Sequence, residues 1–400
     1  MISRGDGRAI SAGGGKRSGA QTPIHQSCAQ RVHVQRRVFH YERGNNKAMG
    51  SVRPSLATLI RTTELTLADA AAELRVIRGG RTQDCSDTNR DAPPLTCTPD
   101  ELPPANFADI SKPSATTLLP PVLWSLPGSG STMTRQLIDL AAGVYTGSKY
   151  YDRDLARLLP GERLDVRKCC GNCSRLSLIK VHPGVPDDRL NVCAGKIMRA
   201  ILLVRHPLRA AWSEFQRMAA QAGCFAGEGG DVSPASKTMG HVATIPLSQW
   251  TPELRAQWLA FHPPFLSKWA AVWRPNGAYD DFLVQKISKR GTGNLSRRAL
   301  VLRFETLHEC DTTVRTAALR SVLNFMRVGK SKSQRHIDCA FAALQHDSVR
   351  RAMKRPRDER SSVSATLAYG GTVGSKAWAL VADVATLFGY ACGELCDDIH

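Results

Sequence analysis

The 400-residue sequence has no run of about 18 consecutive apolar residues, the length that a helix needs to cross a bilayer. The N-terminal region also lacks the apolar core of a secretory signal peptide. The sequence therefore predicts no transmembrane segment.

The twelve cysteines do not show the spacing of a metal site. Residues 169–173 (CCGNC) contain one CxxC pair, but no second pair and no matching histidines follow at zinc-site spacing. We therefore expect no bound metal. Cys85 and Cys97 are spaced for a small disulfide loop, and buried free thiols are the alternative. The even count of cysteines favours the Golgi lumen or another organelle over the cytosol, without deciding the compartment.

Acidic residues are scarce near the N-terminus, where residues 1–61 contain eleven Lys or Arg but two acidic residues. Large apolar residues are also few there, so this region cannot bury enough surface to fold, and we expect a disordered basic tail over 1–54. Its composition is typical of a targeting segment or of a nonspecific polyanion binder. Residues 55–119 predict a short helix and a proline-rich linker, and residues 120–395 the main domain.

Within the main domain, apolar runs alternate with helical patterns. The runs over 121–126, 176–182, 197–204 and 299–304 predict buried strands, while residues 132–142, 208–220 and 312–327 predict helices. Alternating strands and helices predict an α/β fold, a P-loop-like three-layer domain with a central, mostly parallel sheet. Ligands of such folds bind outside the carboxyl ends of the strands.

A glycine-rich turn follows the first predicted strand. Residues 123–140 read LWSLPGSGSTMTRQLIDL, so a strand, a Pro-Gly-Ser-Gly turn and a helix start come in direct succession. Such a turn aims several backbone N–H groups at one point, where the helix dipole adds positive potential that suits a phosphate or sulfate. An ordinary strand-to-helix turn is the alternative interpretation.

The same turn does not end in Gly-Lys-Ser/Thr, the sequence that holds the β- and γ-phosphates and magnesium in P-loop enzymes. Its absence disfavours a P-loop nucleotide-phosphate kinase or NTPase. A non-catalytic polyanion-binding protein, acting through the basic tail, is an alternative of a different class.

Four segments at predicted strand ends together resemble the sulfotransferases that use 3′-phosphoadenosine 5′-phosphosulfate (PAPS). Residues 127–132 resemble the loop for the 5′-phosphosulfate, and Lys180-Val-His182-Pro183 resembles the Lys-Thr-His segment of that family. Arg205-His-Pro207 with Ser213 matches the 3′-phosphate site, including its eight-residue gap, and residues 301–307 (VLRFETL) resemble a later strand. The resemblance is greatest to the branch of WSC-domain-containing sulfotransferases. It rests on PGSGSTMTR, on residues 145–148 (YTGS) and on residues 160–162 (PGE).

The resemblance implies a role for each matched residue. His182 would accept the proton of the acceptor hydroxyl, with Glu162 as the alternative base, and Lys180 would neutralise charge on the sulfonate or bridging oxygen. Both strand residues, Lys180 and His182, alternate to one face. The co-substrate PAPS would be held by the glycine-rich loop and by two arginines and a serine beyond it: Pro127, Gly128, Ser129, Gly130, Ser131, Thr132, Met133, Arg135, Arg205 and Ser213.

The loop departs from the family at two positions. Gly128 replaces a lysine, whose charge Arg135 could supply unless it lies on a solvated helix face, and a lysine at 128 is expected to be tolerated. Met133 replaces a tryptophan that stacks on adenine, a role that a thioether can fill with weaker geometry. Residues 371–376 (GTVGSK) resemble the C-terminal loop over the 3′-phosphate.

The expected acceptor is a hydroxyl group on a glycan, a protein or a small molecule, and no specific nucleic-acid partner is expected. Aromatic residues concentrate in 258–273, where Trp269 and Trp273 are spaced to share one helix face and predict core packing. Residues 261–265 (FHPPF) predict a turn that lines an acceptor groove.

Overall fold

The computed structural model describes two isolated residues and ten ranges: Cys97, Leu102, 120–150, 155–157, 159–164, 175–183, 199–222, 244–274, 298–308, 311–328, 333–345 and 362–396. The expected basic tail, nearly all of the expected helix and linker, and the CxxC segment lie outside the described residues. Among those described, no helix is long and apolar enough to span a membrane.

The described strands form one parallel sheet, as the sequence predicts. The strands are β1 (Val122–Ser125), β2 (Gly147–Ser148), β3 (Ile179–Val181), β4 (Ala200–Val204) and β5 (Ala299–Arg303), in the order β2-β3-β1-β4-β5. Every neighbouring pair is parallel. Because β1 lies between β3 and β4, the loops after these three strands leave the same edge of the sheet side by side, which is where ligands bind in such folds.

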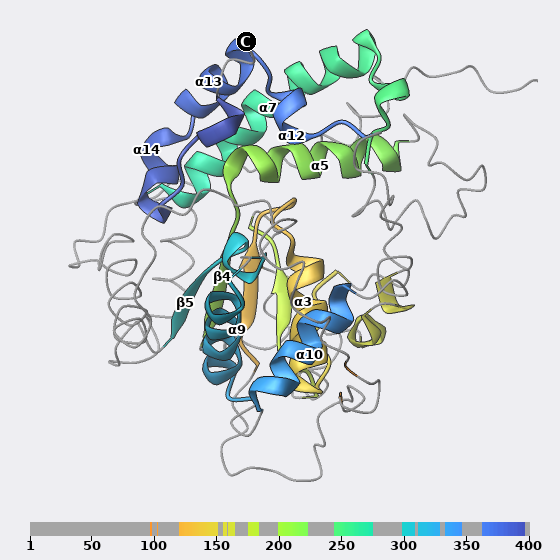
Figure 1. Ribbon diagram of the computed structural model, residues 1–400, viewed down its shortest axis with the longest axis vertical. Helices are drawn as coiled ribbons and strands as arrows, with labels where there is room; N and C mark the ends of the chain where they lie inside the picture. Colours follow the sequence, from red (N-terminus) through yellow and green to blue (C-terminus); the bar gives the residue numbers. More distant parts are fainter. Residues whose placement is uncertain are drawn as a thin grey trace, which may run out of the picture.

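Helices cover the two faces of the sheet (Figure 1). On one face lie α3 (Ser131–Ala142), α9 (Thr312–Met326) and α10 (Gln334–Gln345), whose apolar side chains pack with Leu123 of β1. On the other face lie α5 (Pro207–Gln221), α7 (Pro252–Trp273), α12 (Ala365–Ala368), α13 (Thr372–Ala379) and α14 (Ala382–Ala385), which pack with Trp124. Alternate residues of β1 therefore serve separate cores, and the α/β prediction is confirmed.

Short 3₁₀ helices join these elements. They are η3 (Leu155–Arg157), η4 (Pro160–Arg163), η8 (Leu247–Gln249), η12 (Glu305–His308), η14 (Thr386–Phe388) and η15 (Gly393–Leu395).

The aromatic segment 258–273 forms α7 from its second turn to its C-terminal end. Trp269 and Trp273 are buried, and the Trp273 ring meets Trp124 edge-on with centroids 5.1 Å apart, which confirms their predicted core role. The predicted turn over 261–265 is wrong, because α7 continues through Pro263 and Pro264. The prolines remove two backbone donors, but burial of the flanking aromatic side chains on both sides keeps the helix continuous.

The disulfide of Cys97 differs from the expected loop to Cys85. Cys97 is bonded to Cys339 of α10, across a sequence separation of 242 residues, and Cys392 is bonded to Cys396. Leu102 packs against the same core cluster as α10. Connectivity of this kind cannot be deduced from cysteine spacing.

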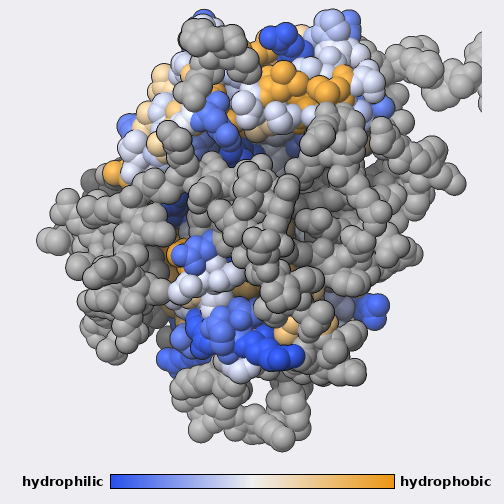
Figure 2. Space-filling model, viewed as in Figure 1, coloured by the Kyte–Doolittle hydropathy of each residue, from blue (hydrophilic) through white to orange (hydrophobic). Residues whose placement is uncertain are grey.

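The two helical layers present different surfaces. Figure 2 shows hydrophilic residues over α9 and α10 and an apolar area over the opposite helical layer. Leu259 on α7 and Leu367 on α12 are among the exposed large apolar side chains.

Candidate functional site

The loop between β1 and α3 is shaped by two glycines in the left-handed region. Gly128 has φ 78° and Gly130 has φ 79°. Gly130 is the N-cap of α3 and provides no side-chain cap, and the Thr134 N–H donates the first helical hydrogen bond to its carbonyl, at 3.0 Å. The backbone N–H groups of residues 131–133 therefore lie at the open N-terminal end of the helix, as an anion site requires.

Neither glycine could carry a side chain without a clash. A Cβ on Gly130 would overlap the ring of Phe304, and one on Gly128 would overlap the carbonyl oxygen of Ala210 on α5. The expectation that a lysine is tolerated at position 128 is therefore wrong, because both the backbone conformation and the close approach of α5 require glycine there.

The loop encloses a buried hydroxyl group. Ser129 is 1% exposed, and its Oγ has no hydrogen-bond partner among the described residues. Ser131 is also buried, while Pro127, Thr132 and Met133 are half-buried. A buried hydroxyl without a partner is costly, so this group is a hydrogen-bond donor that a ligand could use.

Arg205 connects the loop to the end of β4. Its Nη1 donates to the Gly128 carbonyl at 2.8 Å, and its guanidinium lies 4.7 Å from the centroid of the Phe304 ring. The structure therefore brings the predicted loop and the predicted arginine together. Ser213 lies half-buried two turns along α5, between Ala210 and Glu214, which both line Gly128.

Lys180 and His182 lie at the end of β3. Lys180 is buried and pairs in register with Leu123 of β1 and Ser148 of β2. Nδ1 of the half-buried His182 is within hydrogen-bond distance of the Ser125 carbonyl, so Nδ1 carries the proton. The basic nitrogen of a neutral imidazole is then Nε2.

These side chains share one face of the sheet. Leu123 pairs in register with Lys180 and with Ile201, and Leu123 and Ile201 pack on the side of α3. By the two-residue period of strands, Lys180, His182 and Arg205 continue on that side, the side from which the glycine-rich loop enters α3. Residues from three strand ends thus meet at one edge of the sheet.

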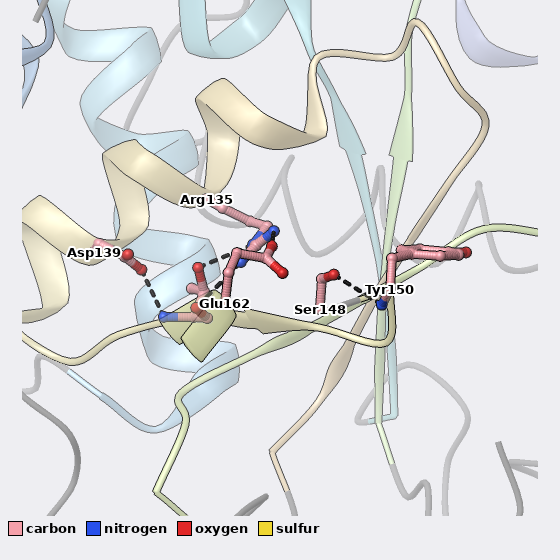
Figure 3. A network of polar contacts seen from close by, with 6 residues as sticks. Arg135, Asp139, Ser148, Tyr150 and Glu162 are labelled. Atoms are coloured by element: carbon pink, nitrogen blue, oxygen red, sulfur yellow. Dashed lines mark hydrogen bonds and ion pairs between the residues drawn. The ribbon is translucent and has the colours of Figure 1, made fainter. Parts of the chain in front are cut away.

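Arg135 and Glu162 form a buried ion pair beside this edge (Figure 3). Both side chains are fully buried, with Arg135 Nη1 bonded to Glu162 Oε1. Arg135 also donates from Nε to Thr146 Oγ1 at 3.0 Å and from Nη2 to the Thr146 carbonyl at 3.2 Å. The alternative of a solvated helix face for Arg135 is therefore wrong. That Arg135 also supplies charge to the loop stays a prediction.

Asp139 is a buried carboxyl that sequence reasoning missed. Its Oδ1 accepts from the Thr146 N–H at 2.7 Å, and its Oδ2 is buried without a partner among the described residues. Burial raises the pKa of Asp139 to about 7, against the opposing effect of Arg135. Its spacing of four residues from Arg135, within the apolar pattern of the helix, is the sequence signal that could have found it.

The C-terminal helices are joined to the site through His206, which follows Arg205. The His206 N–H donates to Glu305 Oε1 at 2.9 Å, and its ring stacks on Trp378 of α13 at 5.6 Å. Tyr390 donates its hydroxyl proton to Glu305 Oε2 at 2.8 Å. The loop expected over residues 371–376 is helical instead, because α13 begins at Thr372 with Gly371 as its N-cap. Gly374 of this helix packs closely on the Leu395 carbonyl.

No family model matches the chain. One curated relative is the "WSCD family member CG9164" of Drosophila melanogaster, 33% identical over 138 residues, which are 34% of this chain and 39% of that protein. The similarity thus spans well under half of the relative's length. It links part of this chain to a WSCD protein and leaves the activity open. Among the described residues, no three His, Cys, Asp or Glu side chains are grouped as a metal site needs.

Proposed function

We propose that this protein is a sulfotransferase that moves the sulfuryl group of PAPS to a hydroxyl of a carbohydrate or protein acceptor. The observation that carries the proposal is the loop before α3, where two left-handed glycines, a buried Ser129 hydroxyl without a described partner and the Arg205 guanidinium meet at the N-terminus of a helix. That arrangement fits a ligand with several negative charges.

The residues present fit the two charged ends of PAPS. The 5′-phosphosulfate would be held by the N–H groups at the start of α3 and by the hydroxyls of Ser129, Ser131 and Thr132. Arg205 offers a planar pair of donors to the 3′-phosphate, and Ser213 would add one hydrogen bond. Met133 is partly buried against the core cluster on the side of α3. Its thioether would pack against the adenine ring.

The chemistry assigned to the chain is proton transfer and charge stabilisation. The acceptor oxygen forms a bond to sulfur while the bond from sulfur to the 5′-phosphate oxygen breaks, and adenosine 3′,5′-bisphosphate (PAP) leaves. Nε2 of His182 takes the proton of the acceptor hydroxyl, and the Lys180 ammonium offsets charge on the leaving oxygen. Glu162, the alternative base, is bonded to Arg135, so we assign it to holding α3.

One observation supports a lumenal setting, and a second supports the family resemblance. Disulfides such as Cys97–Cys339 persist in oxidising compartments, which favours the Golgi lumen or another organelle. The similarity to a WSCD protein supports the resemblance to the WSC-domain-containing branch that the motifs indicate.

The test compares two ligands in one variant. Arg205→Ala should weaken binding of PAP by about thirtyfold or more, because a charge-assisted contact of about 2–3 kcal/mol is lost. Adenosine 5′-phosphosulfate lacks the 3′-phosphate and should lose much less. Calorimetric titration measures both, with Arg209→Ala as the control, since Arg209 pairs with Glu394 on the surface.

Several outcomes contradict the proposal. Equal losses for both ligands would show that Arg205 acts by shaping the loop through Gly128. Binding of ATP with magnesium in place of PAP favours a kinase or NTPase, and binding of neither favours a polyanion-binding protein. Transfer of labelled sulfate from PAPS to a panel of glycans, peptides and alcohols tests the activity.

A further inference from the structure

We propose that Tyr150 is a positioning residue that fixes the orientation of His182. This inference rests on the proposed function, in which His182 accepts the proton of the acceptor. Tyr150 follows β2, the strand next to β3, so its side chain reaches the end of β3 from the neighbouring strand.

The contact between the two residues has two parts. The backbone N–H of His182 donates to the Tyr150 hydroxyl oxygen at 2.6 Å. The two rings also pack against each other, with centroids 5.1 Å apart and planes inclined by 31°. Because β3 ends at Val181, this N–H lies just beyond the sheet ladder, and the phenol supplies its acceptor.

Tyr150 is itself held in place. Its backbone N–H donates to Ser148 Oγ at 3.0 Å, and Ser148 belongs to β2 (Figure 3). Burial raises the pKa of the phenol, which keeps the hydroxyl neutral at physiological pH. A neutral phenol is a stable acceptor for the His182 N–H across the working range of an imidazole.

His182 is thereby held from two strands. On one side its Nδ1 bonds to the Ser125 carbonyl at the end of β1, which selects the tautomer with a basic Nε2. On the other side Tyr150 fixes its backbone and one face of its ring. A base that is held in both ways loses little orientational freedom during proton transfer, and this is the contribution that a positioning residue makes.

The test uses Tyr150→Phe in the full chain, which keeps the ring and removes the acceptor oxygen. Residue-resolved hydrogen exchange at the His182 amide should accelerate by about tenfold or more, as expected for a lost hydrogen bond. The turnover number should fall about tenfold, while the KM for PAPS and the affinity for PAP stay near wild type.

Tyr369→Phe is the matched control. The Tyr369 hydroxyl also bonds to the backbone, donating to the Leu208 carbonyl at 3.2 Å. Tyr369 belongs to the core on the other face of the sheet, the face covered by α5 and α7. This variant should change neither exchange at His182 nor turnover. In a His182→Ala background, Tyr150→Phe should have no further effect on turnover, because it acts through the imidazole.

The outcomes separate this inference from the proposed function. Unchanged exchange at His182 in Tyr150→Phe, or an equal loss of turnover in the His182→Ala background, overturns the positioning role. The exchange measurement needs no activity. A wild-type chain that binds no PAP and transfers no sulfate contradicts the proposed function, whatever the exchange result.

Discussion

At the residue scale, Gly130 and Gly389 have nearly the same backbone conformation in different surroundings. Gly130 has φ 79° and ψ 19°, and Gly389 has φ 71° and ψ 23°. A Cβ on Gly130 would overlap the Phe304 ring, whereas one on Gly389 would lie 3.3 Å from Arg303 Nη1 and overlap nothing. The two positions therefore separate the cost of a left-handed backbone from the cost of filling the space beside the loop.

Substituting both glycines by alanine tests this difference. Gly389→Ala should destabilise the fold by about 1–2 kcal/mol, the cost of a left-handed non-glycine residue. Gly130→Ala should cost about 1–3 kcal/mol more, because Phe304 must move. Urea unfolding measures both, and Gly130→Ala should also weaken PAP binding. Equal stabilities for the two variants would mean that the Phe304 ring yields without cost.

At the residue scale, the sequence predicted the glycine-rich turn but not which side chains pack against it. The glycine-rich turn expected between a buried strand and a helix is observed, and Gly130 in it is left-handed, a conformation that favours glycine. Phe304 comes from the end of β5, 174 positions later, and no local pattern links it to Gly130. The prediction that a lysine is tolerated at position 128 was wrong for the same reason, because the Ala210 carbonyl of α5 lies against Gly128.

At the element scale, α3 is anchored through its buried middle as well as through the loop at its start. Arg135 and Asp139 bond to Thr146, and Arg135 also bonds to Glu162. Asp139 is the costly member of this group, because desolvation outweighs the attraction of Arg135 and raises the pKa of its carboxyl from 3.8 to about 7. The anchor of α3 therefore titrates near neutral pH.

This titration predicts a pH dependence of stability. Between about pH 4 and pH 7 the folded state retains a proton on Asp139 that the unfolded chain has lost, so the free energy of unfolding falls as pH rises through this window. Relative to Asp139→Asn, the wild-type value should fall by on the order of 2–4 kcal/mol from pH 4 to pH 7 and then level. Urea unfolding across pH measures the difference.

Asp383→Asn is the control for this prediction. Asp383 is exposed and pairs with Arg274 at the surface, so its removal should leave the pH profile close to that of the wild type. Parallel profiles for wild type and Asp139→Asn would contradict a raised pKa for Asp139.

The apolar periodicity predicted the bounds of helices and strands better than it predicted whether their charged side chains are buried or exposed. The expected helix over 132–142 is observed as Ser131–Ala142, and the expected strand over 299–304 as Ala299–Arg303. Apolar spacing decides such bounds locally. The burial of Arg135 was harder to predict, because arginine is seldom buried without a partner. Its partner Glu162 comes from a short 3₁₀ helix 27 residues later.

At the scale of the whole molecule, the Cys97–Cys339 disulfide joins the segment before the sheet to α10, the helix beside α3. It closes a loop of 242 residues that contains all five described strands. Constraining so long a loop lowers the entropy of the unfolded chain more than constraining a short one. The disulfide Cys392–Cys396 closes a short loop, with a sequence separation of 4, and should therefore constrain the unfolded chain less.

Cys97→Ser should therefore lower the free energy of unfolding by about 2–5 kcal/mol, while Cys396→Ser should cost less. Urea unfolding under oxidising conditions measures both variants. Reduction of the wild type should lower its stability at least as far as Cys97→Ser does, since a reductant breaks both Cys97–Cys339 and Cys392–Cys396. PAP affinity should be nearly unchanged in Cys97→Ser, because Cys339 belongs to α10 and not to the loop before α3 or to a strand end. A wild type that is equally stable with and without reductant would show that this disulfide does not hold the fold, and it would remove the support that the disulfides give to an oxidising compartment.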